Sequence, residues 1–363
     1  MLNNLNILLP EIFLSLSIFT ILMVGVFIKK SFNIVFNLTS LILILTITII
    51  LNNPNSEEKI FLDSFIRDGF SNYFKILILI SSLFILNSSK NFITENKLDK
   101  FEYPIIILLS ILGMFFMVSA NDIILFYLGL ELQSLSLYIL ASIDRDNLRS
   151  SESGIKYFVL SALSSGLLLY GCSLLYGFTG STNFDLIADQ LSKENIGAVF
   201  AMVFILVGLA FKVSAVPFHM WTPDVYEGAP TSITNYFAVV PKAAGLALII
   251  KFMLVPFSNI LVEWQTILIF ISIASMILGA VAAIVQKNIK RLLAYSSIGH
   301  IGYALAGVAT GEISGYESST IYISIYVIMN IGAFSCLYLL KKDGQYKENI
   351  SDLSGISKKH PLL

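Results

Sequence analysis

Long apolar runs alternate with short polar segments along almost the whole chain. A helix needs about 20 mostly apolar residues to cross the hydrocarbon core of a bilayer, and eleven runs approach or exceed that length. Because backbone polar groups in lipid must be satisfied within helices or a closed barrel, the pattern predicts an all-α, polytopic membrane protein. The predicted spans are residues 8–28, 33–51, 71–88, 104–120, 122–143, 155–178, 197–219, 231–253, 266–285, 292–309 and 321–340. The polar connections 52–70 and 181–194 are interpreted as short interfacial helices.

The composition supports this class. Hydrophobic residues make up 56% of the 363 positions and charged residues 13%, about half the roughly 25% charged fraction of an ordinary soluble domain. So few charges cannot cover the surface of a soluble protein, which excludes a soluble enzyme, a nucleic-acid-binding protein and a disordered segment. The chain has two cysteines, whereas an iron–sulfur cluster usually needs four thiolates. We therefore expect no such cluster in this chain.

The lysines and arginines predict how the spans are oriented. Fifteen of the 23 fall after odd-numbered spans, among them Lys29 and Arg145. The other side carries five, which are Lys59, Arg67, Lys75, Lys193 and Lys251. Basic residues concentrate on the cytoplasmic or matrix side of a membrane, so the N-terminus is predicted to face outward and the C-terminal segment inward. Trp221 and Trp264 lie near span ends, as is typical of interfacial anchors.

Four ionisable residues fall inside predicted spans. Glu131 lies near the middle of the fifth span, Lys212 within the seventh and Lys242 in the middle of the eighth. A charge at the centre of a membrane helix costs about 2.5–3.5 kcal/mol, so such residues persist when they pair, face a wet interior or carry function. Lys156 opens the sixth span, where its side chain can snorkel to the interface. Glu11, at the start of the first span, is interpreted as interfacial.

Two hypotheses account for the central charges. Burial disfavours the charged form of a lysine and a nearby carboxylate favours it, so a movable Glu131 would let Lys212 or Lys242 exchange a proton. The other hypothesis is a static salt bridge that holds the helices together. Pro217 follows Lys212 by five residues, and Pro241 directly precedes Lys242. These helix breakers favour the first hypothesis, because transporters use broken helices to build ion sites near the membrane midplane.

Histidines add further candidates. His219 ends the seventh predicted span, and His300 lies in the middle of the tenth, in YSSIGHIGY. A histidine in a membrane helix acts either as a hydrogen-bonded packing residue or as a proton relay. The hydroxyl neighbours of His300 favour a hydrated helix, although serine hydroxyls also join helices. Both interpretations stay open, and His360 falls in the C-terminal loop.

Two stretches resemble a known family. They read GLAFKVSAVPFHMWTPDVYEGAPTSITNYFAVVPKAAG (208–245) and IKRLLAYSSIGHIGYALAG (289–307). They resemble the antiporter-like membrane subunits of respiratory complex I, and WTPDVYEGAPTS (221–232) is most similar to subunit 2, the N subunit of bacteria. The resemblance covers nearly the whole chain. It implies a fold of fourteen helices with two inverted repeats of five helices each, of which the second is incomplete here.

The resemblance also implies roles for the candidate residues. Glu131 and Lys212 match a family Glu on helix five and its partner Lys on helix seven. Lys242 matches the central Lys of helix eight, Lys156 the Lys of helix six, and His300 the His of helix ten. The implied function is proton translocation in NADH:quinone oxidoreductase, driven by a redox-coupled conformational and electrostatic change. NADH, FMN, iron–sulfur clusters and quinone are then bound by other subunits, and no metal is expected in this chain.

The resemblance divides the chain into helices one to three (1–100), the first repeat (101–255) and part of the second repeat (256–363). The chain stops at HPLL (360–363), where the family continues into a second broken helix. We therefore expect a fragment, or half of a split subunit whose other chain supplies the remaining helices. The other expected partners are membrane subunits of complex I, especially antiporter-like ones, and the lipid bilayer, but not nucleic acid. The expected location is a bacterial inner membrane, or the mitochondrial inner membrane for an organelle-encoded chain. Two alternatives remain: a subunit of a multi-subunit Na⁺/H⁺ antiporter, and a scaffold with static charges.

Overall fold

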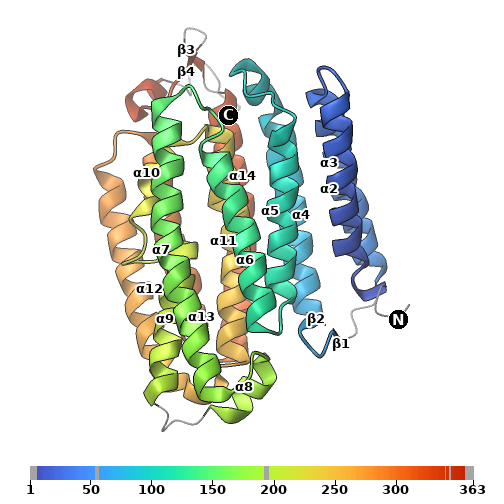
Figure 1. The fold of residues 1–363 in the computed structure, drawn as a ribbon. Helices are drawn as coiled ribbons and strands as arrows, with labels where there is room; N and C mark the ends of the chain where they lie inside the picture. The colour runs from blue at the N-terminus through green and yellow to red at the C-terminus, as the bar shows by residue number, and fades with distance from the viewer. Residues whose placement is uncertain (1–5, 54–56, 192–195, 340, 343–344, 356–363) are drawn as a thin grey trace.

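The computed structural model describes residues 6–53, 57–191, 196–339, 341–342 and 345–355. Within these ranges the chain forms an upright bundle of long helices with small hairpins at its two ends (Figure 1). The elements are α2 (Leu9–Phe27), α3 (Phe32–Asn52), β1 (Glu58–Ile60), β2 (Phe65–Arg67), α4 (Gly69–Glu95), α5 (Glu102–Ser119), α6 (Ile123–Ala141), α7 (Leu148–Thr179), α8 (Phe184–Gln190), α9 (Ile196–Val213), α10 (Trp221–Gly228), α11 (Thr231–Leu254), η1 (Ser258–Ile260), α12 (Leu261–Ile284), α13 (Ile289–Val308), α14 (Ile313–Leu339), β3 (Lys341–Lys342), β4 (Gln345–Tyr346) and η2 (Ile350–Leu353).

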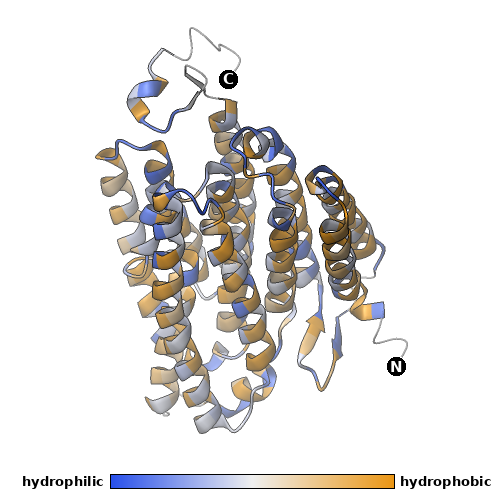
Figure 2. Cartoon of the chain, turned by 45° about the horizontal axis from the view of Figure 1, so that its top comes forward, coloured by the Kyte–Doolittle hydropathy of each residue, from blue (hydrophilic) through white to orange (hydrophobic). Residues whose placement is uncertain are grey.

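The helices match the predicted spans. Ten segments of the described residues are long and apolar enough to cross a membrane, and hydrophobic residues run along their lengths while polar ones gather at the ends (Figure 2). The remaining predicted span is α13, which forms at its expected place but is not among the ten. Lys290, Arg291 and many small or hydroxyl residues lower its hydropathy. It packs closely on α12, because a Cβ at Gly279 would lie only 2.6 Å from the Gly299 amide nitrogen.

The two ends of the bundle are named by the distribution of basic residues. The inner end carries the α6–α7 and α12–α13 loops, and the outer end carries the β1–β2 hairpin and α8 (Figure 1). The predicted interfacial helix within 52–70 is wrong, because β1 and β2 pair as an antiparallel hairpin in the described part of this segment. In the other predicted connection a short helix does form, α8. The Lys59 ammonium of the hairpin lies 2.7 Å from the Asp185 carboxylate of α8.

The seventh predicted span is broken before Pro217, as that proline suggested, and ends earlier than predicted, whereas α11 runs unbroken through Pro241. Helix α9 stops at Val213, and a turn that begins with Ser214 at φ 67° leads into α10. The break leaves the Phe211 carbonyl free to accept hydrogen bonds from the Ser214 amide and the Trp221 indole nitrogen, both at 3.0 Å. The prediction that Trp221 and Trp264 are interfacial anchors is therefore wrong, since both side chains are buried in the bundle.

Helix α11 is the centre of the fold. In its most apolar window 94% of the residues are buried, against 28% in α12 and in α14. Charged groups on α11 are therefore inside the protein and cannot reach lipid or water without passing neighbouring helices. This position matters because α11 carries two lysines, Lys242 and Lys251.

Three charged residues lie deeper than the sequence indicated. Lys75 and Lys251 were assigned to the outer side of the membrane, but both side chains are buried within helices near the outer end. Glu11 was interpreted as interfacial, but it is only 2% exposed. Its Oε1 lies 2.6 Å from the Lys75 ammonium, so α2 and α4 are joined by a buried ion pair.

Candidate functional site

Lys212 lies in the last turn of α9, next to the helix break. Its ammonium donates hydrogen bonds to the hydroxyls of Ser134 on α6, at 2.7 Å, and Ser161 on α7, at 2.8 Å. The Ser161 hydroxyl also accepts a hydrogen bond from the Tyr138 phenol at 2.5 Å. The break explains this position, because the chain turns away after Val213 and leaves the lysine facing α6 and α7.

Glu131 lies on α6, three residues before Ser134. It is close enough to Lys212 to interact with it electrostatically. However, no ion pair joins them in the part of the chain that the structure describes. The Glu131 Oε1 atom is buried and has no hydrogen-bond partner among the described residues. An unsatisfied buried carboxylate oxygen is costly, so this arrangement favours movement of the carboxylate, hydration or protonation.

Lys242 lies in the middle of α11, directly after the internal Pro241, and is 1% exposed. Its ammonium donates a hydrogen bond to the Ser297 hydroxyl of α13 at 2.6 Å. It also lies 5.6 Å from the centre of the Tyr226 ring of α10, a cation–π distance. Like Lys212, this lysine is held by a hydroxyl rather than by a carboxylate.

His300 follows Ser297 by one turn of α13 and faces α14. Its Nδ1 lies 2.6 Å from the Tyr322 hydroxyl, and its ring centre lies 5.2 Å from that of Tyr326. The Tyr326 hydroxyl is bonded to the Ala238 carbonyl of α11 at 3.0 Å. His300 is therefore linked to α14 and lies on the same helix as Ser297, the serine that holds Lys242. Within the described residues no cluster of three or more histidine, cysteine or acidic side chains is placed to hold a metal ion.

Aromatic side chains fill the space between the two lysines. The Tyr138 ring packs edge-on against Tyr157, with centres 5.0 Å apart. Tyr157 stacks on Trp221 at 4.3 Å and an interplanar angle of 7°. Trp221 packs against Tyr226, whose ring faces Lys242. This aromatic stack, Tyr138, Tyr157, Trp221 and Tyr226, connects the Lys212 site to the Lys242 site through contacts that hold no charged group.

The inner end holds a different kind of charge cluster. The Lys156 ammonium pairs with Glu152 at 2.8 Å and with Asp224 of α10 at 3.1 Å. The Arg291 guanidinium of α13 pairs with the same Asp224, at 2.8 Å, and with Glu227, at 3.0 Å. The Lys156 side chain is 43% exposed. It thus lies at the inner surface, apart from the buried Lys212 and Lys242.

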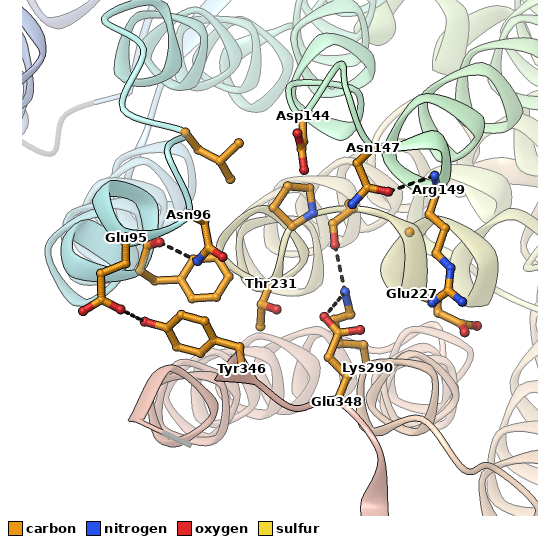
Figure 3. A pocket seen from close by; sticks show the side chains of 15 residues that line it. Glu95, Asn96, Asp144, Asn147, Arg149, Glu227, Thr231, Lys290, Tyr346 and Glu348 are labelled. Carbon is orange, nitrogen blue, oxygen red and sulfur yellow. Dashed lines mark hydrogen bonds and ion pairs between the residues drawn. The ribbon is translucent and has the colours of Figure 1, made fainter. Parts of the chain in front are cut away.

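A cavity of about 440 Å³ opens at the inner end beside the start of α11 (Figure 3). Polar and charged side chains surround it, among them Asn147, Arg149 and Glu227. Lys290 also lines it, and its ammonium donates to the Ala229 carbonyl at 3.0 Å and pairs with Glu348 at 2.6 Å. A polar cavity of this size holds water, so the N-terminus of the central helix α11 is accessible from the inner end.

A family model described as NADH:quinone oxidoreductase/Mrp antiporter, TM, matches residues 120–363. NADH-quinone oxidoreductase subunit N of Pelagibacter ubique is 58% identical over 362 residues, which cover 99% of this chain and 77% of that protein. Subunit N of Parvibaculum lavamentivorans is 51% identical over 358 residues, covering 98% of this chain and 74% of that protein. The chain belongs to the subunit N family.

Solved structures agree with this membership. A chain of respiratory complex I from Thermus thermophilus superposes with a TM-score of 0.83 and 30% identity, covering 97% of this chain and 75% of that one. A chain of the Mrp complex from Dietzia sp. superposes with the same TM-score at 21% identity, covering 98% of this chain and 68% of that one. The second likeness shows the fold alone. This member of the subunit N family is a multi-pass membrane protein and a subunit of a multi-subunit membrane complex.

The structure brings some predicted site residues together and separates others. Glu131 and Lys212 lie near each other, while Lys242 and His300 form a second group around α13. Lys156 belongs to neither group. The sequence marks Ser297 among the hydroxyl neighbours of His300, but nothing in the spacing of Ser134 or Ser161 distinguishes them, because serines are frequent in these helices.

Proposed function

We propose that the chain translocates protons as the N-type membrane subunit of NADH:quinone oxidoreductase, and that Lys212 and Lys242 carry the protons. One observation carries this proposal: at membrane depth both lysines are held by hydroxyl groups, with Glu131 near the first of them but not bonded to it. The named relatives support the assignment to this enzyme.

Hydroxyl partners suit a lysine that changes its protonation state. A serine hydroxyl accepts a hydrogen bond from an ammonium group and can turn to donate one to a neutral amine. Ser134, Ser161 and Ser297 can therefore satisfy Lys212 and Lys242 in both states. A carboxylate at ion-pair distance would instead favour the charged state alone. Movement of Glu131 toward Lys212 then stabilises the positive charge of the lysine, and movement away favours release of its proton.

The placement of the groups supports a proposed direction of proton movement. Water in the inner cavity supplies protons near the start of α11. Lys212 and Lys242 hold them at membrane depth, and His300 offers the next titratable group, toward α14. Lys156 stays at the inner surface, where its pairing with Asp224 positions α10 against α7.

The remaining parts of the proposal concern the setting. NADH, FMN, iron–sulfur clusters and quinone belong to other subunits, and this chain supplies proton transfer. Its partners are the other membrane subunits of the enzyme, including antiporter-like ones, in the cytoplasmic membrane of a bacterium, since the named relatives are bacterial. Its functional divisions are residues 1–100, the first repeat 101–255 and the part of the second repeat within 256–363.

The test uses the assembled enzyme in inverted membrane vesicles. Glu131→Gln and Lys212→Met are expected to abolish most NADH-driven proton uptake while the complex still assembles, because each removes one member of the controlling pair. Lys287→Met serves as the matched control, since it replaces an exposed lysine in the loop before α13. Proton uptake at the level of the control in both variants would refute the proposal.

An Na⁺/H⁺ antiporter subunit is the alternative, favoured by the joint description of the family model. Purification of the native complex discriminates between the two. Flavin, iron–sulfur clusters and NADH oxidation in the particle support the proposed enzyme. A cofactor-free complex that exchanges Na⁺ for protons would replace that assignment.

A further inference from the structure

A second group of buried charges lies at the outer end, away from Lys212 and Lys242. It consists of Glu11 on α2, Lys75 on α4 and Lys251 on α11, which we call the outer charge cluster. All three side chains are almost fully buried, with exposed fractions of 2%, 1% and 6%. Burying three ionisable groups together is costly unless they are paired or functional. The pairing within the cluster is incomplete, as the contacts of each group show.

The Glu11–Lys75 pair is tight but not fully satisfied. The two groups meet at 2.6 Å through Glu11 Oε1, while Glu11 Oε2 is buried without a hydrogen-bond partner among the described residues. The Lys75 ammonium lies between the Phe65 ring of β2, at 5.2 Å, and the Phe115 ring of α5, at 5.5 Å. Aromatic faces stabilise a cation weakly compared with a carboxylate. The Glu11 carboxylate is therefore the main partner of Lys75. Its Oε2 atom remains able to accept a proton or a hydrogen bond from water.

Lys251 has no carboxylate at ion-pair distance within the described residues. Its ammonium donates to the Val118 carbonyl at 3.0 Å, one of the carbonyls that the last turn of α5 leaves free. The charges that act on it are those of Asp68, Lys75, Asp185 and Lys59. The Lys251 ammonium is therefore buried with a single carbonyl acceptor and no bonded carboxylate among the described residues.

The surroundings of Lys251 connect it to the outer surface. Asp68 caps α4 and is half-buried, and the Asp185 side chain is 44% exposed. The β1–β2 hairpin covers the cluster and is fastened to α8 by the exposed Lys59–Asp185 pair. The two carboxylates whose charges act on Lys251 are thus both partly exposed to the outer surface. Lys242 lies nine residues earlier on α11, which is about 14 Å along the axis and on the opposite face of the helix, so the two lysines form separate sites.

We propose that the outer charge cluster is an outward-facing proton-exchange site, in which Lys251 is the group that takes up and releases the proton. On release, an N–H bond of the Lys251 ammonium breaks and the proton passes to water beside Asp68 or Asp185. The neutral amine keeps a hydrogen for the Val118 carbonyl, and the loss of its positive charge relieves its repulsion with the Lys75 ammonium of the Glu11–Lys75 pair. This inference rests on the proposed function, because it gives a proton-translocating chain an exchange point on its outer side.

A purely structural role makes different predictions. As a structural group Lys251 would cap the C-terminus of α5, which an arginine can also do because it donates hydrogen bonds and carries a permanent charge. An arginine cannot release a proton at physiological pH. If the Glu11–Lys75 pair only holds α2 against α4, an uncharged pair of similar size can replace it. Buried ion pairs are often replaced by apolar residues without loss of stability.

The experiment measures protons moved per NADH oxidised in vesicles that contain the assembled enzyme. Lys251→Arg and Lys251→Met are expected to lower this ratio equally, by as much as Lys242→Met does. The double variant Glu11→Gln with Lys75→Met is expected to stay low as well, and Lys287→Met should keep the wild-type ratio. Native gels report assembly, and Lys251→Arg keeps the test valid where Lys251→Met fails to assemble.

Two outcomes overturn the inference. If Lys251→Arg moves as many protons per NADH as the wild type, Lys251 is only a structural cap of α5. If the double variant does so, Glu11 and Lys75 only join α2 to α4. These outcomes are distinguishable from failure of the proposed function. If Lys242→Met loses pumping while Lys251→Arg pumps normally, only the outer site is refuted, whereas normal pumping in Lys242→Met refutes the proposed function itself.

Discussion

The cations at membrane depth and those at the inner end are held in contrasting ways. Lys212 and Lys242 donate to serine hydroxyls. Lys156 and Arg291 instead share the Asp224 carboxylate. Helices α7, α10 and α13 contribute to both groups, whereas Lys212 and Lys242 themselves lie on α9 and α11. The two groups therefore differ in the partner that holds each cation and in its burial, since Lys242 is buried and the Lys156 side chain is partly exposed.

The contrast indicates which cations keep their proton and which can exchange it. A carboxylate partner stabilises a cation and opposes loss of its proton, which suits residues that position α10 against α7 and α13. A hydroxyl partner supports the charged and the neutral lysine alike, which suits proton transfer. The variants below test this comparison by removing one partner or one cation at a time.

The largest effect is expected for Lys242→Met. Methionine fills a similar volume but cannot hold a proton, so NADH-driven proton uptake should fall at least about tenfold. Ser297→Ala removes the hydroxyl partner and keeps the lysine, so part of the activity should remain. Fluorescence quenching in inverted vesicles measures both. An equal loss in the two variants would show that the hydroxyl, and not the exchangeable proton, decides activity at this site.

A smaller effect is expected for Asp224→Asn. The change leaves Lys156 with Glu152 and Arg291 with Glu227, and the pairs that it breaks are partly exposed. Partly exposed pairs contribute about 1 kcal/mol or less, so the thermal midpoint of the complex should fall slightly and pumping should change by less than about twofold. A loss of pumping as deep as that of Lys242→Met would break the comparison, since the carboxylate-held cations would then belong to the proton path.

The smallest effect is expected at the exposed Lys59–Asp185 pair of the outer end. Partial desolvation raises the pKa of the Asp185 carboxyl, but hydrogen bonds from Lys59 and Asn121 and the charge of Lys59 outweigh it, and the net pKa lies below the ordinary 3.8. A lowered carboxyl pKa adds stability at neutral pH, and this stability is lost as the pH falls below 3.8 and through the lowered value. Lys59→Met should therefore cost less than about 1 kcal/mol at pH 7 and almost nothing in strong acid. Thermal unfolding curves at several pH values measure the difference, and a constant difference down to strong acid would contradict the assigned cause.

The sequence was informative where a property is local and repeated along the chain. Hydropathy located the eleven long helices among the described residues, because each span satisfies its own backbone, but their ends differ from the predicted ones by up to eight residues, as at the start of α14. Pro217 marked the break after Lys212. The β1–β2 hairpin was missed because its strands are three residues long, too short for an alternating pattern to be seen.

The partners of the charged residues could not be predicted in the same way. Glu11 and Lys75 are 64 positions apart, and each lies near a span end where sequence favours exposure. Trp221 looked like an interfacial anchor because its distance from the span end was known but the path of the broken helix was not. Which serine meets which lysine depends on how α6, α7 and α13 rotate about their axes, and no local pattern encodes that rotation.

The aromatic stack between Lys212 and Lys242 has an electrical consequence. Two charge-carrying sites joined by a permanent file of water would conduct protons in either direction and short-circuit the membrane potential. Trp221 is held by its indole hydrogen bond to the Phe211 carbonyl and stacked on Tyr157, so apolar rings in direct contact lie between the two lysine sites. The broken helix therefore has two effects. It places Lys212 at the end of α9, and its freed Phe211 carbonyl holds Trp221 in the aromatic stack that separates the two lysine sites.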